Sequence, residues 1–170
     1  METEIQIREL RGELDEMAEL QQVLEGTPDY FERITGSPPG RAEAQSNYTH
    51  LPDGKSYEDK FVYGVFRNDD MVGCADVIRG YPTDDTAQIG FLLIAEAYQR
   101  QGIGRAAYQR IEEQCRSWPG IERVRIGVVE TNAMVIPFWE KMGFRRTRET
   151  WPYRYGPVHS TAIIFEKILA

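Results

Sequence analysis

The stretch that most constrains the fold is Ala87–Arg116, where a short apolar segment leads into a glycine-containing turn and then an amphipathic segment. Ile89–Ile94 is nearly all apolar and rich in strand-forming residues, which predicts a buried strand. From Ile103 to Trp118 the apolar residues recur every three or four positions, which predicts one buried face of a helix. The stretch therefore predicts a strand–turn–helix unit around which the rest of the chain is arranged.

The turn, Gln99–Arg105, has the properties of an anion site. The first backbone N–H groups of a helix have no internal acceptor, and the helix dipole adds about half a positive charge there. Gly102 and Gly104 have no Cβ, so a phosphate can approach the main chain closely. Arg100 and Arg105 flank the same point and can add charge-assisted hydrogen bonds. The local chemistry therefore predicts a phosphate or pyrophosphate at this turn.

Two other interpretations of the turn stay open. Gly102–Ala107 fits G-x-G-x-x-A, the dinucleotide-binding fingerprint, but that motif is weak on its own. In that fold the strand leads directly into the first glycine, whereas here the polar segment Ala95–Gln101 intervenes and too few residues follow for the usual second half. The remaining interpretation is an ordinary loop that tolerates glycine.

The pattern Gln99-x-x-Gly102-x-Gly104 after an apolar strand resembles the acyl-CoA-binding signature Q/R-x-x-G-x-G/A of the GNAT superfamily of N-acetyltransferases. Further along, Asn132–Phe144 is similar to the family's N-x-x-A…L/F-Y-E-K-x-G-F segment. Two motifs in the family's order are more specific than either one alone. The resemblance is closest over Ala87–Phe144, and the rest of the chain matches by the order of its elements.

The resemblance implies an α+β fold, an α/β three-layer arrangement with a mixed central sheet of about seven strands and helices on both faces. It implies one GNAT-like acetyltransferase domain over residues 1–170. The implied function is transfer of an acetyl group from acetyl-CoA, the cosubstrate, to a primary amine by direct attack in a ternary complex. The alternative is an acyl-CoA-binding sensor or regulatory protein without turnover.

Positions that match the family's motifs give the predicted cosubstrate site. The main chain of Leu92–Ile94 is expected to hold the pantetheine as an added strand would, with the Leu92 N–H as the oxyanion donor. Asn132 is expected beside the pantetheine, and an N-cap role alone is the alternative for it. In full, the predicted cosubstrate-binding residues are Leu92, Leu93, Ile94, Gln99, Arg100, Gln101, Gly102, Ile103, Gly104, Arg105, Asn132 and Trp139. No metal ligand is expected among them.

Two positions depart from the family's pattern. Many members carry a glutamate general base where this chain has Gln88, and a tyrosine general acid where it has Trp139. An amide cannot accept the proton, and an indole N–H cannot usefully release one. A water held by Gln88 could relay the proton, and burial is expected to raise the pKa of a glutamate substituted there. The residues considered as replacements are Glu130, Tyr153, Tyr155 and His159, and the predicted catalytic set is Leu92, Gln88, Glu130 and Tyr155.

The remaining segments supply the other elements. Strands are predicted at residues 4–10, 60–67, 71–79, 123–129, 144–155 and 160–167. Helices are predicted at residues 12–24, 28–34 and near 41–47, and a further one begins close to Val135, so that Pro137 lies in its first turn and Gly143 follows its end. The irregular segment 36–60 resembles the family's acceptor region, and the residues considered for the pocket wall are Tyr30, Phe31, Tyr48 and His50.

The net charge of −7 argues against broad nucleic-acid binding, for which a basic stripe is expected. It is compatible with a cationic acceptor, either a small molecule or a peptide amine. No apolar run approaches the ~20 residues of a membrane span, and the N-terminal segment has no signal pattern. We therefore expect a cytoplasmic protein that contacts neither membrane nor nucleic acid, as a monomer or homodimer, with Cys74 and Cys115 as buried free thiols.

Overall fold

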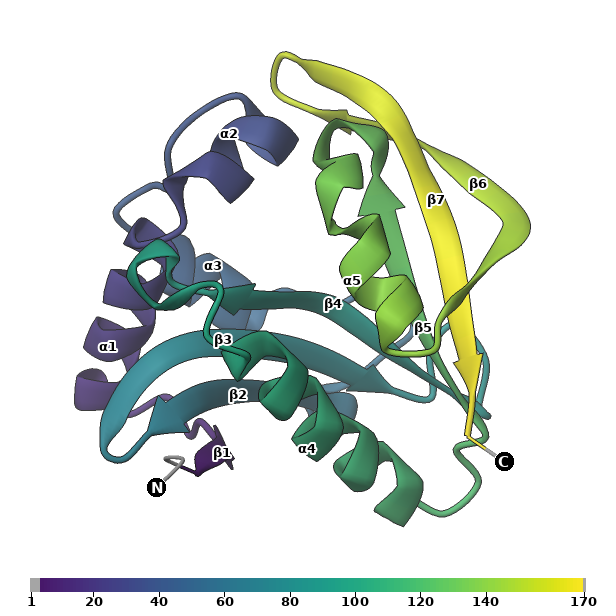
Figure 1. Cartoon of the computed structure of the whole chain (residues 1–170), viewed down its shortest axis with the longest axis horizontal. Helices are drawn as coiled ribbons and strands as arrows, with labels where there is room; N and C mark the ends of the chain where they lie inside the picture. The colour runs from purple at the N-terminus through teal and green to yellow at the C-terminus, as the bar shows by residue number, and fades with distance from the viewer. Residues whose placement is uncertain (1–3, 170) are drawn as a thin grey trace.

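The computed structural model describes residues 4–169 (Figure 1). The elements in chain order are β1 (Ile5–Glu9), α1 (Leu14–Glu25), α2 (Pro28–Thr35), α3 (Glu43–Thr49), η1 (Tyr57–Asp59), β2 (Lys60–Arg67), β3 (Asp70–Arg79), β4 (Thr86–Ile94), η2 (Glu96–Tyr98), α4 (Ile103–Ser117), β5 (Arg123–Val129), η3 (Glu130–Val135), α5 (Ile136–Lys141), β6 (Arg145–Tyr155) and β7 (Val158–Ile168), where η marks a 3₁₀ helix.

The seven strands form one mixed sheet in the order β1-β2-β3-β4-β5-β7-β6. Only β4 and β5 run parallel to each other, and every other neighbouring pair in this sheet is antiparallel. One face of the sheet packs against α1 and α3 through a cluster that includes Leu20, Ala44 and Cys74. The other face packs against α4 and α5 through a cluster that includes Tyr108 and Trp139. The expected three-layer fold, with helices on both faces, is therefore confirmed.

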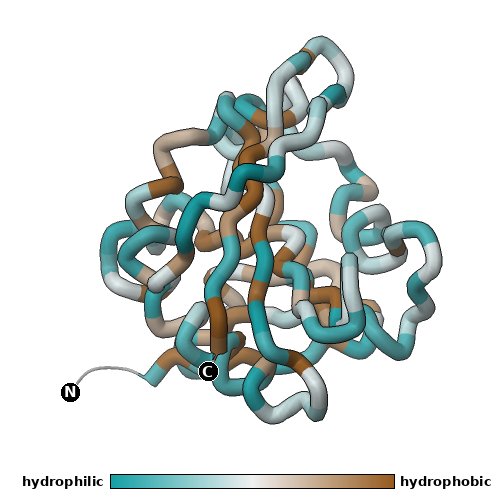
Figure 2. Tube along the Cα trace, turned by 90° about the vertical axis from the view of Figure 1, so that its right-hand side faces the viewer, coloured by the Kyte–Doolittle hydropathy of each residue, from teal (hydrophilic) through white to brown (hydrophobic). Residues whose placement is uncertain are grey.

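The cores lie between the layers, as the apolar patterns predict. Figure 2 shows the apolar segments gathered along the strands in the middle of the molecule and the polar ones along its outer edges. Cys74 and Cys115 are both buried and unbonded, as expected. Among residues 4–169, no helix is long and apolar enough to cross a membrane.

The sheet opens in its middle, between β4 and β5. The two strands pair only from Thr86–Ile89 to Arg123–Ile126. Beyond that point β5 turns away from β4 (Figure 1). Gly90 is an extra residue in the β3–β4 ladder, because Ile89 pairs with Val77 while Phe91 pairs with the adjacent Asp76. A bulge of this kind bends a strand. β4 keeps its pairing with β3 up to Ile94, while its other edge has no β5 partner beyond Ile89.

The helix after β5 differs in one respect from the prediction. Pro137 lies in the first turn of α5, as predicted, and Gly143 follows the helix end with φ 99°. Asn132 does not cap that helix. It lies inside η3 with the non-helical dihedrals φ −113° and ψ 26°, and its side chain is hydrogen-bonded to another helix. The capping prediction was wrong because a tertiary contact uses the side chain instead.

Candidate active site

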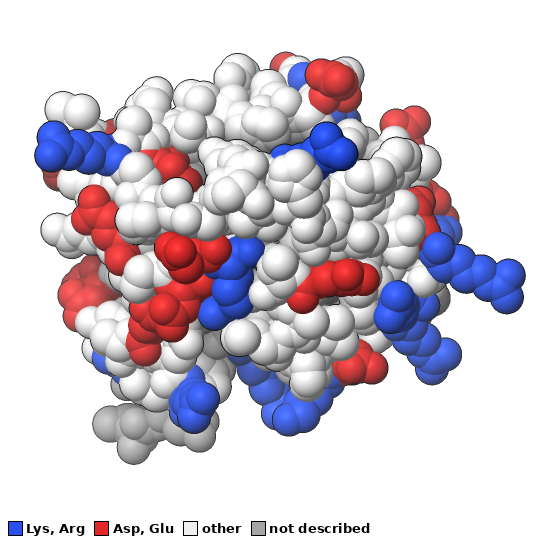
Figure 3. Space-filling view, turned by 90° about the horizontal axis from the view of Figure 1, so that it is seen from above, with Lys and Arg blue, Asp and Glu red and all other residues white. Residues whose placement is uncertain are grey.

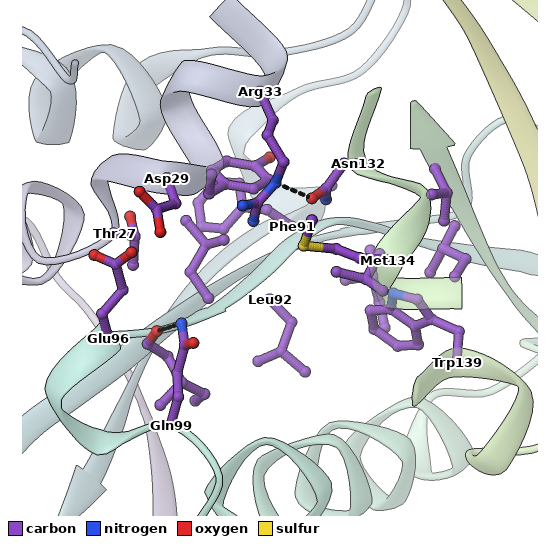
Figure 4. A pocket seen from close by; sticks show the side chains of 18 of the residues that line it. Thr27, Asp29, Arg33, Phe91, Leu92, Glu96, Gln99, Asn132, Met134 and Trp139 are labelled. Carbon is purple, nitrogen blue, oxygen red and sulfur yellow. Dashed lines mark hydrogen bonds between the residues drawn. The ribbon is translucent and has the colours of Figure 1, made fainter. Parts of the chain in front are cut away.

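A cavity of about 330 Å³ occupies the opening between β4 and β5 (Figure 4). The second half of β4 and the end of β5 form two of its sides, α2 closes it from above in Figure 1, and η3 and α5 complete it. The cavity therefore lies where a regular sheet would have continued its hydrogen bonds.

The free edge of β4 presents main-chain groups to this cavity. Ala95 donates its N–H to the carbonyl of Val72 on the β3 side, at 2.9 Å. Because successive residues of a strand point their main-chain groups to opposite edges, Leu93 also faces β3, while Leu92 and Ile94 face the opening. The Ile94 carbonyl accepts a hydrogen bond from Gln99 Nε2 at 2.9 Å. The Leu92 N–H is therefore directed at the cavity.

The turn after β4 leads into α4 through a left-handed glycine. Gly102 is the N-cap of α4 with φ 78°, and its carbonyl accepts the first helical bond from Ala106 N–H, at 3.2 Å. The N–H groups that precede Ala106 in the helix, from Ile103 to Arg105, have no acceptor in the preceding turn. No heavy atom lies within 4 Å of the position that a Cβ on Gly102 would occupy. The helix start is therefore open to a ligand.

Two residues of the turn, Arg100 and Gln101, differ in whether they face the cavity. Arg100 is exposed, lines the cavity and has φ 64°, a left-handed conformation that is uncommon for residues other than glycine. Gln101 points to the outside, where its Oε1 accepts from Arg67 Nη1 at 3.0 Å. Of the predicted cosubstrate-binding residues, those lining the cavity are Leu92, Leu93, Ile94, Gln99, Arg100, Asn132 and Trp139. The adjoining turn and helix start hold Gln101, Gly102, Ile103, Gly104 and Arg105.

The wall opposite the free edge is joined by a side-chain hydrogen bond that the sequence did not predict. Arg33 Nε on α2 donates to Oδ1 of the buried Asn132 on η3, at 2.8 Å (Figure 4). Both side chains line the cavity. This bond holds α2 over the end of β5 and fixes the orientation of the Asn132 amide.

Two carboxyl groups also face each other at the edge of the cavity, Asp29 on α2 and Glu96 on η2 (Figure 4). Burial first, and then the hydrogen bond and charge of Asp29, raise the pKa of Glu96. Sequence reasoning missed this pair, because the two residues come from distant segments and no local pattern joins them.

Trp139 occupies the inner end of the cavity. It is 7% exposed and packs edge-on against Tyr108, Phe138 and Phe144. Its ring therefore belongs to the core between the sheet and α4 and also forms part of the cavity wall.

The other residues predicted for proton transfer are not among the cavity-lining residues. Gln88 lies where β4 still pairs with β5, and its Oε1 accepts from Arg125 Nη1 at 3.1 Å. Glu130 is exposed at the start of η3, and Tyr155 is 58% exposed in the final hairpin. The hydroxyl of Tyr153 donates to the carbonyl of Ile34 at 2.8 Å, which attaches β6 to α2. The catalytic roles of these residues stay predictions.

The residues considered for the acceptor wall separate into different environments. Tyr30 lines the cavity, and burial is the main reason that its pKa is raised. Phe31 is buried in the core beneath α1. The Tyr48 hydroxyl donates to the Leu10 carbonyl at 3.4 Å, and His50 is exposed. Tyr30 is thus the member of this set that reaches the cavity.

A model of the acetyltransferase (GNAT) family matches residues 21–144, so the chain belongs to that family. An acetyltransferase of Thermus thermophilus superimposes with a TM-score of 0.76 at 22% identity, covering 97% of each chain. The ribosomal-protein-S18-alanine N-acetyltransferase of Escherichia coli gives 0.68 at 19% identity, covering 98% of this chain and 94% of its own. An N-acetyltransferase of Staphylococcus aureus gives 0.69 at 16% identity, covering 98% and 99%.

At these identities the structural likeness shows the fold. No curated protein matches the chain.

Proposed function

We propose that this chain is an N-acetyltransferase that moves an acetyl group from acetyl-CoA to a primary amine by direct attack in a ternary complex. The observation that carries the proposal is that the free edge of β4 and the open helix start of α4, which follows it after η2, lie at one cavity. An extended amide chain can bind along the first, and a pyrophosphate at the second, within one continuous cavity.

The residues present fit this cosubstrate. Leu92 and Ile94 face the opening with main-chain groups, one of which already accepts from Gln99. Apart from its chain neighbours, no protein atom lies within 4 Å of the position that a Cβ on Gly102 would occupy, which leaves room for a phosphate. Arg100 and Arg105 are exposed at the same turn and supply positive charge. When bound, the thioester supplies an acyl carbon that an amine can attack.

Three residues of the chain have proposed roles around that acyl carbon. The Leu92 N–H is the proposed donor to the oxygen that becomes negatively charged during attack. Asn132, held by Arg33, is the proposed contact for the pantetheine, and Trp139 closes the inner end of the cavity.

Direct attack is supported by the positions of the cysteines. Cys74 and Cys115 are both fully buried and neither lines the cavity. Burial raises the pKa of Cys74 and raises that of Cys115 to about 12. Because the thiolate is the nucleophilic form, neither side chain is suited to carry an acyl group.

For the acceptor we propose a cationic primary amine, on a small molecule or a peptide. Asp29 and Glu96 lie at the cavity edge, and the chain has a net charge of −7. Seen from above, acidic side chains gather over the side of the molecule that carries α1, with some basic ones among them and others at the opposite end (Figure 3). A surface of this kind favours approach of a positively charged amine. The cytoplasmic location and the monomeric or homodimeric state stay predictions.

Acetyl-CoA binding and turnover are the two measurements that test the proposal. Calorimetry should detect 1:1 binding of acetyl-CoA, and a thiol-detecting assay over a panel of small amines and short peptides should show amine-dependent release of CoA. Binding without release for any amine would favour the acyl-CoA sensor. Absence of binding would overturn both.

A further inference from the structure

Asp76 is a buried carboxylate that pairs with Phe91 across the ladder; it lies behind the cavity-lining residues Gly90 and Phe91 and is not itself one of them. It lies on β3 and is 8% exposed. Its Oδ1 accepts from Lys60 Nζ on β2 at 2.9 Å, and the Lys60 side chain is 3% exposed. Within residues 4–169, Lys60 is the hydrogen-bond partner that the structure gives to this carboxylate. The second oxygen, Oδ2, is therefore without a donor from that part of the chain.

That second oxygen is directed at Gly90. It lies 2.6 Å from the position that a Cβ on Gly90 would occupy, closer than any real Cβ contact. Gly90 is the bulge residue of β4, is exposed and lines the cavity. The missing side chain at this position thus lets a buried carboxylate approach the β4 main chain where β5 leaves it. Phe91, the partner of Asp76 across the ladder, directly precedes Leu92.

The charges around Asp76 are few and identifiable. Burial is the main cause that raises the pKa of Asp76, while Lys60 and His50 lower it. Cys74 lies two residues away on the same strand, and burial raises its pKa too, so that it is a neutral thiol near pH 7. A carboxylate with a raised pKa is a stronger base than an exposed one, and a cation beside it favours its ionised form.

We propose that Asp76 is the proton acceptor for the attacking amine, reaching it past Gly90 directly or through one water, with Lys60 as its positioning residue. The inference deepens the proposed acetyl transfer and rests on it. It assigns to β3 the role that the amide of Gln88 on β4 cannot perform.

The proton and electron balance is simple. The ammonium form of the acceptor gives one proton to the Asp76 carboxylate and becomes a neutral amine. The nitrogen lone pair forms the C–N bond, and the C–S bond breaks with its electron pair going to sulfur. The second nitrogen proton passes to solvent or to the leaving thiolate, whose reference pKa is about 8.5. Asp76 then returns its proton to solvent.

The test compares pH–rate profiles of the full chain, with acetyl-CoA and the best amine of the panel described above. In the wild type, kcat/KM should fall as pH is lowered through the Asp76 pKa, because the protonated carboxyl cannot accept. Asp76→Asn should lower kcat/KM about 100-fold, within the usual range for loss of a general base, and should abolish that acidic limb. Lys60→Met removes a charge that lowers the Asp76 pKa, so the limb should move to higher pH. Acetyl-CoA affinity should change less than about twofold in both.

Asp59→Asn is the matched control. It removes a carboxylate that is paired with Lys55 and Arg79 and is not among the cavity-lining residues, and its profile should stay that of the wild type. Where Asp76→Asn fails to fold, Gly90→Ala tests the same point, because its methyl group would displace Oδ2 while both charges stay. It should lower kcat with acetyl-CoA affinity kept.

The outcomes separate the two proposals. Wild-type protein that acetylates no amine overturns the transferase proposal, and the proton acceptor with it. Active wild type with an unchanged acidic limb in Asp76→Asn, or wild-type kcat in Gly90→Ala, overturns the role of Asp76 alone.

Discussion

The two sides of the cavity are built from different parts of the chain. The β4 side consists mainly of main-chain groups from one continuous segment, Leu92–Arg105, with glycines where a ligand must come close. The opposite side consists of side chains from separate elements, above all the Arg33–Asn132 bond between α2 and η3. The first side is suited to a fixed ligand such as a nucleotide cosubstrate, and the second can vary with the acceptor.

A substitution on the main-chain side should have the largest effect. Gly104→Val puts a β-branched side chain at the open helix start, and we expect acetyl-CoA affinity to fall by ~100-fold or more, about 2.8 kcal/mol. The fold should persist, because the nearest atoms to a Cβ there, on Phe138 and Ile94, are at ordinary contact distances of 3.5 and 3.7 Å. Calorimetry would measure the acetyl-CoA affinity, and circular dichroism would show whether the variant is folded.

Gly40→Val is the control for that change. Gly40 is exposed and a Cβ on it would meet only Glu43 Oε2, at 3.8 Å. Acetyl-CoA affinity in this variant should equal that of the wild type. If Gly104→Val also binds normally while remaining folded, the pyrophosphate does not bind at this helix start.

Substitutions on the opposite side of the cavity, where Arg33 bonds to Asn132, should lower the free energy of unfolding. Arg33→Met leaves the buried Oδ1 of Asn132 without its donor, and the free energy of unfolding should fall by about 1–3 kcal/mol. Asn132→Ala should lower it by a similar amount, and the double variant by little more than either single one, because both remove the same bond. Urea unfolding would measure all three, with the exposed Arg41→Met as control. Strictly additive losses would mean that the bond contributes nothing.

The contrast between the walls also explains what the sequence could predict. The β4–turn–α4 unit, with its glycine pattern and apolar periodicity, is encoded locally, and its elements were found where they were predicted. The partners Arg33 and Asn132 are 99 residues apart, and the approach of Asp76 to Gly90 depends on a bulge in strand pairing. Such contacts arise from tertiary packing. For the same reason the alternative role of Asn132 as a helix cap was wrong, because its side chain bonds to Arg33 instead.

At Arg100 the effect of the side-chain charge can be separated from the effect of the backbone conformation. Arg100→Ala removes the charge but keeps a non-glycine residue at φ 64°. Arg100→Gly removes the charge and also relieves the left-handed strain, so it should raise the free energy of unfolding by about 1 kcal/mol relative to Arg100→Ala. Both should weaken acetyl-CoA binding equally, by a few-fold that shrinks in high salt. Unequal affinities would show that the turn conformation, rather than the charge, decides binding.

The smallest effect is expected at Gln88, and here the structure reverses the expectation from sequence. A glutamate at this position would lie beside the buried Arg125, which already donates to the Gln88 side chain and pairs with Glu149. The guanidinium favours the ionised form, so the pKa of the new carboxyl should be held below its usual range instead of being raised by burial. Gln88→Glu should therefore change kcat/KM less than about threefold near pH 7 and add no acidic limb close to neutrality. Adding Arg125→Met to Gln88→Glu removes the cation, and a limb at higher pH should then appear. A limb near neutrality that Gln88→Glu shows and the wild type lacks would mean that Arg125 does not control this site and that a carboxylate at position 88 can supply the base.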